Sequence, residues 1–249
     1  MQCGDSTVRE KPLDKMSINL KKHQMNKELP KICYWCGKEL TDETNKTEHV
    51  PPLGFFPKGH REQLITVPAC NEHNTDFSLL DERFQVYIKA IGTNQIATDN
   101  FKDKVVRGLN REQSKKFVES LSKNSFYADI DGKKRLVFKI DTEYTQKFVE
   151  KVIRGLYFYH NGKPAKGNVL SFSVQFDNPD LNYEELFDHL LEDLRTEYMT
   201  EGDYKNPDVF RYRYFNLTDY DVFLVVLSFY KGVEFIGWVL PDTLPPEII

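Results

Sequence analysis

Three of the four cysteines in this chain lie between residues 33 and 70, in a spacing that suits a metal ion. Cys33 and Cys36 form a Cys-x-x-Cys pair, and Cys70 and His73 form a second pair with the same spacing. Two intervening residues let both side chains of a pair face one tetrahedral ion, and three cysteines with one histidine are an accepted structural zinc set. The sequence therefore predicts structural Zn²⁺. The alternative is a group of free cysteines buried in the core.

A second set of polar residues lies beside these pairs and suits the hydrolysis of a phosphodiester. Such a reaction needs a base for water, a hard cation on the phosphate and relief of charge on the leaving oxygen. His49 suits the base because its ordinary pKa lies near neutrality. Glu48 and Asn74 offer the oxygen ligands that a hard cation prefers. The alternative has His49 as a packing residue or zinc ligand and Asn74 as a helix cap; His73 could also compete for the catalytic metal.

Short elements must bring these residues together. Gly37 closes a tight knuckle after the first cysteine pair, since glycine accepts a positive φ. Residues 47–50 predict a strand that Pro51 ends, and residues 63–67 predict a second strand that Pro68 ends. A helix is expected from about residue 70 through residue 84. The order is knuckle, strand, loop, strand and helix.

The rest of the chain predicts an α+β fold with a C-terminal antiparallel sheet. We expect helices over residues 82–96, 100–121, 142–159 and 182–199, the last of them acidic, and strands over residues 135–140, 169–176, 209–216, 221–229 and 233–240. The last two strands are joined by a hairpin turn at residues 230–232. We divide the chain into a polar N-terminal arm (1–30), a metal module (31–98) and an accessory mixed α/β domain (99–249).

Overall charge gives no general attraction to nucleic acid, because the net charge is -4 and the pI is about 5.9. Any phosphate contact must come from local basic residues, and the candidates are Lys58, Arg61, Arg83, Lys102, Lys104 and Arg107. An ordinary solvated helical face is an equal alternative for the basic stretch over residues 102–116. The sequence lacks a long apolar run and a secretory signal, which predicts a cytoplasmic protein with no membrane partner.

The motifs together resemble an HNH endonuclease with an embedded zinc site, the ββα-metal fold. The resemblance rests on Cys-x2-Cys, Glu-His-Val-x-Pro, Val-Pro-Ala-Cys-x2-His-Asn and Phe-Ser-x-x-Asp-Glu, over about residues 32–84. It implies metal-dependent hydrolysis of DNA, with His49 as general base, Glu48 on a catalytic Mg²⁺ or Mn²⁺, and Asn74 in the place of the final histidine. The second strand lacks the asparagine that orients the histidine in this family, and Gln63 and Thr66 are the nearest polar residues.

Two functions therefore compete. The first is a metal-dependent endonuclease acting on double-stranded DNA, with a bacterial defence or mobile-element setting as its context. The second is a zinc-ribbon module that binds nucleic acid or protein without chemistry. The sequence does not separate DNA from RNA. The accessory domain is a candidate surface for a protein partner or a homodimer.

Overall fold

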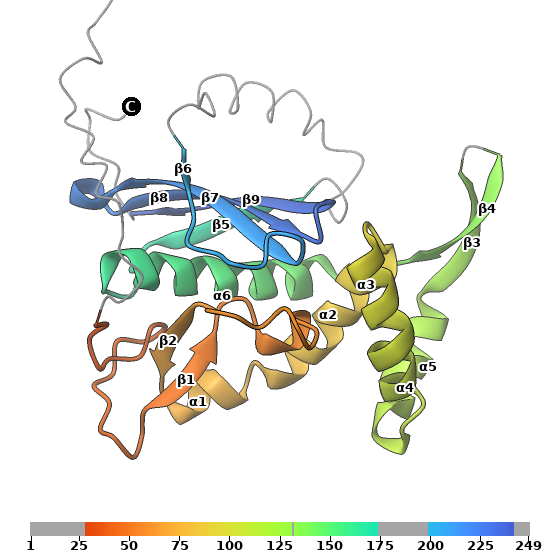
Figure 1. Cartoon of the computed structure of the whole chain (residues 1–249), viewed down its shortest axis with the longest axis horizontal. Helices are drawn as coiled ribbons and strands as arrows, with labels where there is room; N and C mark the ends of the chain where they lie inside the picture. Colours follow the sequence, from red (N-terminus) through yellow and green to blue (C-terminus); the bar gives the residue numbers. More distant parts are fainter. Residues whose placement is uncertain (1–27, 131, 174–198, 242–249) are drawn as a thin grey trace, which may run out of the picture.

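The structure, a computed structural model, describes residues 28–130, 132–173 and 199–241, and it is built in three layers (Figure 1). A five-stranded antiparallel sheet forms one outer layer, and a long helix, α6 (Thr142–Asn161), lies against it. On the other side of α6 lie a two-stranded hairpin and two helices, which together we call the lower layer. The candidate site residues belong to this lower layer.

The lower layer consists of short elements. Strands β1 (Lys46–His49) and β2 (Thr66–Ala69) pair antiparallel, with His49 opposite Thr66 and Glu48 opposite Val67. The connection between them contains the single 3-10 turn η1 (Leu53–Phe55). Helix α1 (Asn71–Thr75) follows β2 directly, and α2 (Ser78–Ile91) ends where Gly92 adopts a left-handed conformation with φ of 63°.

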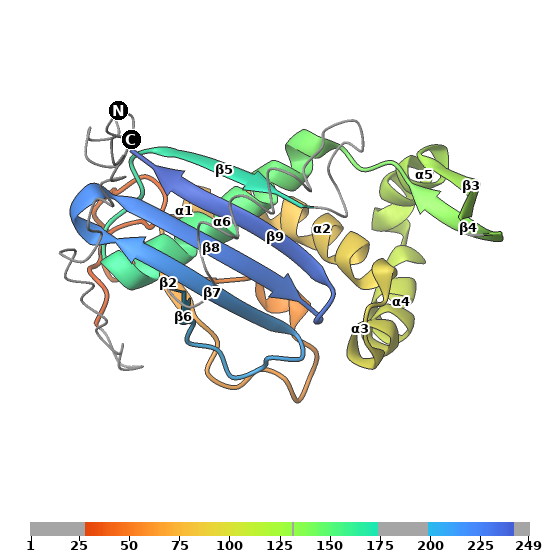
Figure 2. The ribbon, with the colours of Figure 1, turned by 90° about the horizontal axis from the view of Figure 1, so that it is seen from above.

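The five strands of the large sheet lie in the order β5-β9-β8-β7-β6 (Figure 2). They span β5 (Asn168–Phe172), β6 (Thr200–Glu201), β7 (Phe210–Leu217), β8 (Val222–Phe229) and β9 (Val233–Leu240). Tyr230 and Lys231 have positive φ values and turn β8 into β9, which confirms the predicted hairpin. Helix α6 runs beneath this sheet and begins at Asp141, whose carboxylate accepts a hydrogen bond from the Glu143 amide at 3.0 Å.

A string of small elements projects from one end of the molecule (Figures 1 and 2). It comprises α3 (Gln95–Asn100), the π-helical turn η2 (Phe101–Val105), α4 (Val106–Leu109), η3 (Glu112–Ser114), α5 (Lys115–Lys123) and the hairpin β3 (Ser125–Ile130) and β4 (Lys133–Phe138). Within the described ranges, none of the helices is both long and apolar enough to cross a bilayer.

One hydrophobic cluster joins all three layers. It contains Val50 and Phe84 from the lower layer, Phe148 from α6, and Phe229 and Phe235 from the large sheet. The rings of Phe84 and Phe148 are stacked with centroids 4.1 Å apart. The core therefore crosses the expected boundary between the metal module and the accessory domain, a division that stays a prediction.

The predicted α+β class with a C-terminal antiparallel sheet is confirmed, and the differences are local. Strand β2 starts at Thr66 because Gln63 has a φ of 49°, which interrupts an extended chain. Pro68 lies inside β2, where an edge strand tolerates it. The single helix expected over residues 100–121 is wrong, because the turns η2 and η3 divide it. Residues 1–27 of the expected N-terminal arm (1–30) and residues 182–198 of the expected acidic helix (182–199) lie outside the described residues.

The packing of α6 gives a first prediction. A Cβ at Gly155 would lie 2.6 Å from Cγ2 of Val50, a stiff β-branched side chain in the core. We expect Gly155→Ala to lower the free energy of unfolding by about 1–3 kcal/mol despite the better helix propensity of alanine. Gly108→Ala in α4 is the control, since a Cβ there meets nothing within 4 Å. Denaturant unfolding checks this, and equal stability of the two variants would contradict it.

Candidate metal centre

The first cysteine pair lies on a tight knuckle at the start of the lower layer. The amide of Cys33 donates to the Lys38 carbonyl at 2.8 Å, and the amide of Gly37 donates to the Cys33 carbonyl at 2.9 Å. Gly37 has a φ of 75°, which confirms the predicted need for glycine at this turn. The Tyr34 amide donates to the Pro68 carbonyl at 2.9 Å and holds the knuckle against β2.

The second pair lies at the junction of β2 and α1. Cys70 is the N-cap residue of α1, and His73 lies one turn later. Three residues of separation place two side chains on the same face of a helix, so Cys70 and His73 point towards the knuckle. The first turn of α1 thus forms the other half of the site.

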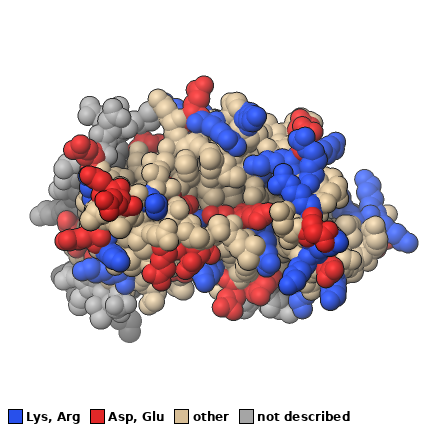
Figure 3. Space-filling model, turned by 90° about the horizontal axis from the view of Figure 1, so that it is seen from below, with Lys and Arg blue, Asp and Glu red and all other residues tan. Residues whose placement is uncertain are grey.

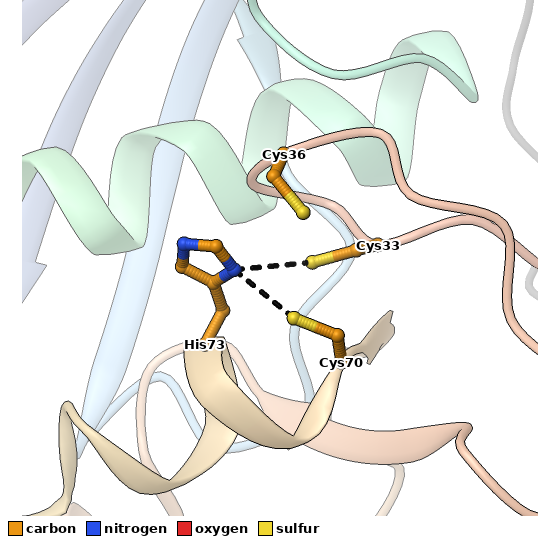
Figure 4. A group of neighbouring side chains, drawn as sticks. All are labelled: Cys33, Cys36, Cys70 and His73. Atoms are coloured by element: carbon orange, nitrogen blue, oxygen red, sulfur yellow. Dashed lines mark hydrogen bonds between the residues drawn. The ribbon is translucent and has the colours of Figure 1, made fainter.

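The four side chains converge on one point (Figure 4). The sulfur atoms of Cys33, Cys36 and Cys70 and a ring nitrogen of His73 all lie within 4.8 Å of one another. His73 Nδ1 is 3.1 Å from the Cys70 sulfur and 3.8 Å from the Cys33 sulfur. With zinc–sulfur distances of about 2.3 Å and zinc–nitrogen distances of about 2.0 Å, ligand atoms of a tetrahedral site are separated by similar amounts. These four residues, which we call the metal group, could therefore hold a metal ion such as zinc.

Aromatic packing connects this group to α6. The Trp35 ring lies 5.8 Å from the His73 ring in a stacked arrangement and 4.9 Å from the Phe77 ring. The guanidinium of Arg154 in α6 also lies over the Trp35 ring, 5.1 Å from the ring centroid. The orientation of His73 is thus supported by side chains from two layers.

Glu48 lies in a buried cluster of charged and polar side chains. Its Oε2 accepts a hydrogen bond from the Asn74 amide nitrogen at 3.1 Å, so the structure brings these two predicted residues together. Its Oε1 is 3.0 Å from Nζ of Lys151, which also lies 2.5 Å from Oδ2 of Asp81. The side chains of Glu48 and Lys151 are only 7% and 3% exposed.

The contacts of Glu48 do not fit the magnesium or manganese ion that the resemblance implies. A hard cation needs carboxylate and amide oxygens turned towards it. Here one oxygen of Glu48 faces an ammonium group, and the other faces the amide N–H group of Asn74. Nothing in this arrangement indicates a divalent cation at these two residues.

His49 lies next to Glu48 on β1 and is half-buried. Burial lowers the pKa of His49 below its usual value; the charge of Glu48 opposes this effect, and the charge of Arg61 adds to it. Thr66 is the cross-strand partner of His49, and it was one of the two polar residues predicted to lie near it. The partly buried position of His49 therefore favours the neutral form of the imidazole.

Arg61 also belongs to a group of positive charges around the loop between β1 and β2, which we call the basic cluster (Arg61, Lys89 and Lys104). Burial, with smaller contributions from the charges of Lys104 and Arg61, lowers the pKa of Lys89 to about 7. Nζ of Lys89 donates to the Gly54 carbonyl at 2.8 Å and to Oε1 of Gln85 at 3.0 Å. Seen from the side of the lower layer, Lys and Arg gather towards the end that carries α3–α5 (Figure 3).

The other predicted basic residues behave differently. Lys58, Lys102 and Arg107 are exposed. Arg83 is partly buried, and its guanidinium lies over the Phe117 ring of α5 at 5.3 Å from the centroid. Phe55 and Phe56, in the loop between β1 and β2, are buried in the core.

Sequence reasoning missed Lys151 and the burial of Lys89, which it took for a basic residue near the helix that could contact the phosphate backbone. Lys151 interrupts the apolar stripe of α6 three residues after Phe148, and Lys89 lies directly after the buried Ile88 in α2. A lysine at a core-facing position of an amphipathic helix is a signal of a buried charge that needs partners. That signal is visible in the printed sequence.

Comparison with protein-family models, with curated proteins and with solved structures finds no match to this chain.

The metal group gives the second prediction. We expect about one zinc per chain in purified protein, and Cys36→Ser should lose it and lower the melting temperature by on the order of 10 °C, because the ligands close the short elements of the lower layer. Cys3→Ser is the control and should keep the metal. Elemental analysis with thermal unfolding measures both, and a zinc-free wild type would refute the assignment.

Lys89 gives the third prediction, on pH. Its pKa is lowered to about 7 in the folded protein, whereas an unfolded lysine titrates near pH 10.4. Between these values the unfolded chain binds more protons, so this residue makes stability rise with pH, by at most about 1.4 kcal/mol per pH unit.

We therefore expect the stability difference between wild type and Lys89→Met to move in favour of wild type from pH 7 to pH 9. Denaturant unfolding at each pH measures it. Lys102→Met, at an exposed position of η2, should follow wild type across the range. A difference that does not change with pH would show that Lys89 stays charged in the folded protein.

Proposed function

We propose that the chain is an endonuclease that hydrolyses phosphodiester bonds in DNA, with His49 as the general base. The observation that carries this proposal is the position of a neutral, half-exposed imidazole beside the basic cluster. Arg61 is close enough to affect the pKa of His49, Lys89 and Lys104. A base for water and positive charge for a phosphate thus lie in one region.

The chemistry needs a neutral base and a bound anion at the same time. Burial keeps the proton off His49 near pH 7, because a charged imidazole would lose solvation. A phosphate at the basic cluster is attracted by Arg61, whose planar guanidinium suits phosphate oxygens. His49 then takes a proton from water as the water oxygen attacks phosphorus, the bond from phosphorus to the leaving 3′-oxygen breaks, and that oxygen takes a proton from solvent.

The proposal includes a structural zinc ion on Cys33, Cys36, Cys70 and His73. Its finer part, a Mg²⁺ or Mn²⁺ ion on Glu48 and Asn74, is the less supported one, because Lys151 is bound to Glu48. The proposal therefore assigns the neutralisation of the phosphate charge to Arg61 and Lys104, the exposed members of the basic cluster. Whether cleavage requires a divalent ion is decided by the plasmid assay in Mg²⁺, Mn²⁺ and EDTA.

The experiment, our fourth prediction, is nicking of a supercoiled plasmid by the zinc-loaded full chain in Mg²⁺, in Mn²⁺ and in excess EDTA. We expect cleavage by wild type and a rate about 10²–10⁴-fold lower for His49→Ala, the range for a general base. His60→Ala, in the loop between β1 and β2, is the control and should cut normally. Normal cutting by His49→Ala would refute the base assignment. The same assay on RNA shows which polymer is the substrate.

A second candidate function is supported by the ion pair of Glu48 itself. A zinc-stabilised module whose carboxylate is neutralised by Lys151 fits nucleic-acid binding without chemistry. In that case wild type and His49→Ala would bind DNA equally and cut nothing, and Arg61→Gln would weaken binding and reduce its salt dependence.

A further inference from the structure

The buried cluster of Glu48, Asp81, Asn74 and Lys151 has the composition of a cation site. Two carboxylates from β1 and α2 and one side-chain amide from α1 point at a common region. The cation present there is the ammonium of Lys151, which α6 supplies. It is 3.0 Å from one carboxylate and 2.5 Å from the other, and its position over the Phe77 ring, 5.3 Å from the centroid, adds a cation–π contact.

The charges of this cluster are not balanced. Burial raises the pKa of Asp81 to about 6, and the charge of Lys151 opposes the rise. At pH 7 the Asp81 carboxylate is therefore largely ionised, and the formal charges of two carboxylates and one ammonium sum to -1 in a buried place. A divalent ion in the place of Lys151 would leave none.

Two further polar atoms in this region have no partner. Oδ1 of Asp81 and the hydroxyl of Tyr34 are both buried without a hydrogen bond among the described residues. Tyr34 is completely buried and lies close enough to Glu48 and Asp81 for their charges to act on it. Unsatisfied buried oxygens are costly, and they are the ligand type that a hard cation or an ordered water would engage.

We infer that Lys151 is the resident cation of a two-carboxylate site, and that it excludes divalent ions from Glu48 and Asp81 in the resting protein. Removal of the ammonium opens a site for a hard divalent ion, formed by Glu48, Asp81 and the side-chain oxygen of Asn74. Rotation of the Asn74 amide about its last torsion presents that oxygen. The inference concerns the region of the proposed function, but it requires no cleavage.

The first arm of the experiment uses Mn²⁺ as the probe and keeps the ion pair intact. Binding of Mn²⁺ to the zinc-loaded full chain is followed by electron paramagnetic resonance. We expect wild type and Glu48→Gln to bind Mn²⁺ equally weakly, because Lys151 already occupies Glu48. Asp81 still pairs with Lys151 in this variant, which supports its folding. A site in wild type that Glu48→Gln removes would overturn the inference.

The second arm removes the ammonium. Lys151→Met keeps the length of the side chain, and we expect it to bind one Mn²⁺ at least tenfold more tightly than wild type and to gain thermal stability from Mn²⁺. Lys147→Met on the exposed side of α6 is the matched control and should behave as wild type. Folded Lys151→Met without the new site would overturn the inference.

Lys151→Met leaves two unpaired buried carboxylates and could fail to fold for that reason. A third variant keeps the test decisive in that case. Asp81→Asn/Lys151→Met removes one of these charges and retains three oxygen ligands. It should bind Mn²⁺ more tightly than Asp81→Asn alone, and equal affinities would overturn the inference. Nicking is scored separately: an inactive wild type with a new Mn²⁺ site in the variant refutes the proposed nuclease and leaves the inference standing.

Discussion

Helix α6 is covered by protein on two opposite sides, and this constraint decides what its charged residues must do. Lys151 points into the lower layer, where water does not reach it, so its charge requires Glu48 and Asp81 as partners. Arg154, one turn later, is less buried and reaches Glu150 and the Ala165 carbonyl while covering Trp35. The electrostatics of the candidate site therefore follow from the packing of one helix between two layers.

The short elements of the lower layer are stabilised by contacts with α6, and a metal ion on the four ligands would stabilise them in a different way. Strands β1 and β2 have four residues each, and α1 has five, which is too little for an independently stable hairpin or helix. A metal on the four ligands would fix the knuckle to the start of α1. The ion pair of Glu48 and the contact of Val50 with Gly155 then hold β1 against α6.

Local patterns in the sequence predicted what depends on local chemistry. The two ligand pairs were found by spacing, and the turn at Gly37 and the hairpin at Tyr230 by residue type. The prediction of one helix over residues 100–121 was wrong because the apolar positions in this stretch do not show where η2 and η3 interrupt it. The partner of Glu48 could not be found from its neighbours, because Lys151 lies about a hundred residues away along the chain, and only the three-layer packing brings the two together.

Hydrogen bonds between the lower layer and the far end of the chain have a consequence for synthesis. The Tyr230 hydroxyl donates to the Phe55 carbonyl, Asn206 donates to the Glu62 carbonyl, and Asn94 donates to the Asp208 carbonyl. In a growing chain the bonds of Asn206 and Asn94 require residues 206 and 208, and the bond of Tyr230 cannot form until the ribosome has added residue 230. Before that point Phe55 lacks the Phe229 ring and Phe84 lacks the Phe235 ring, so the nascent N-terminal part exposes apolar surface while its core is incomplete.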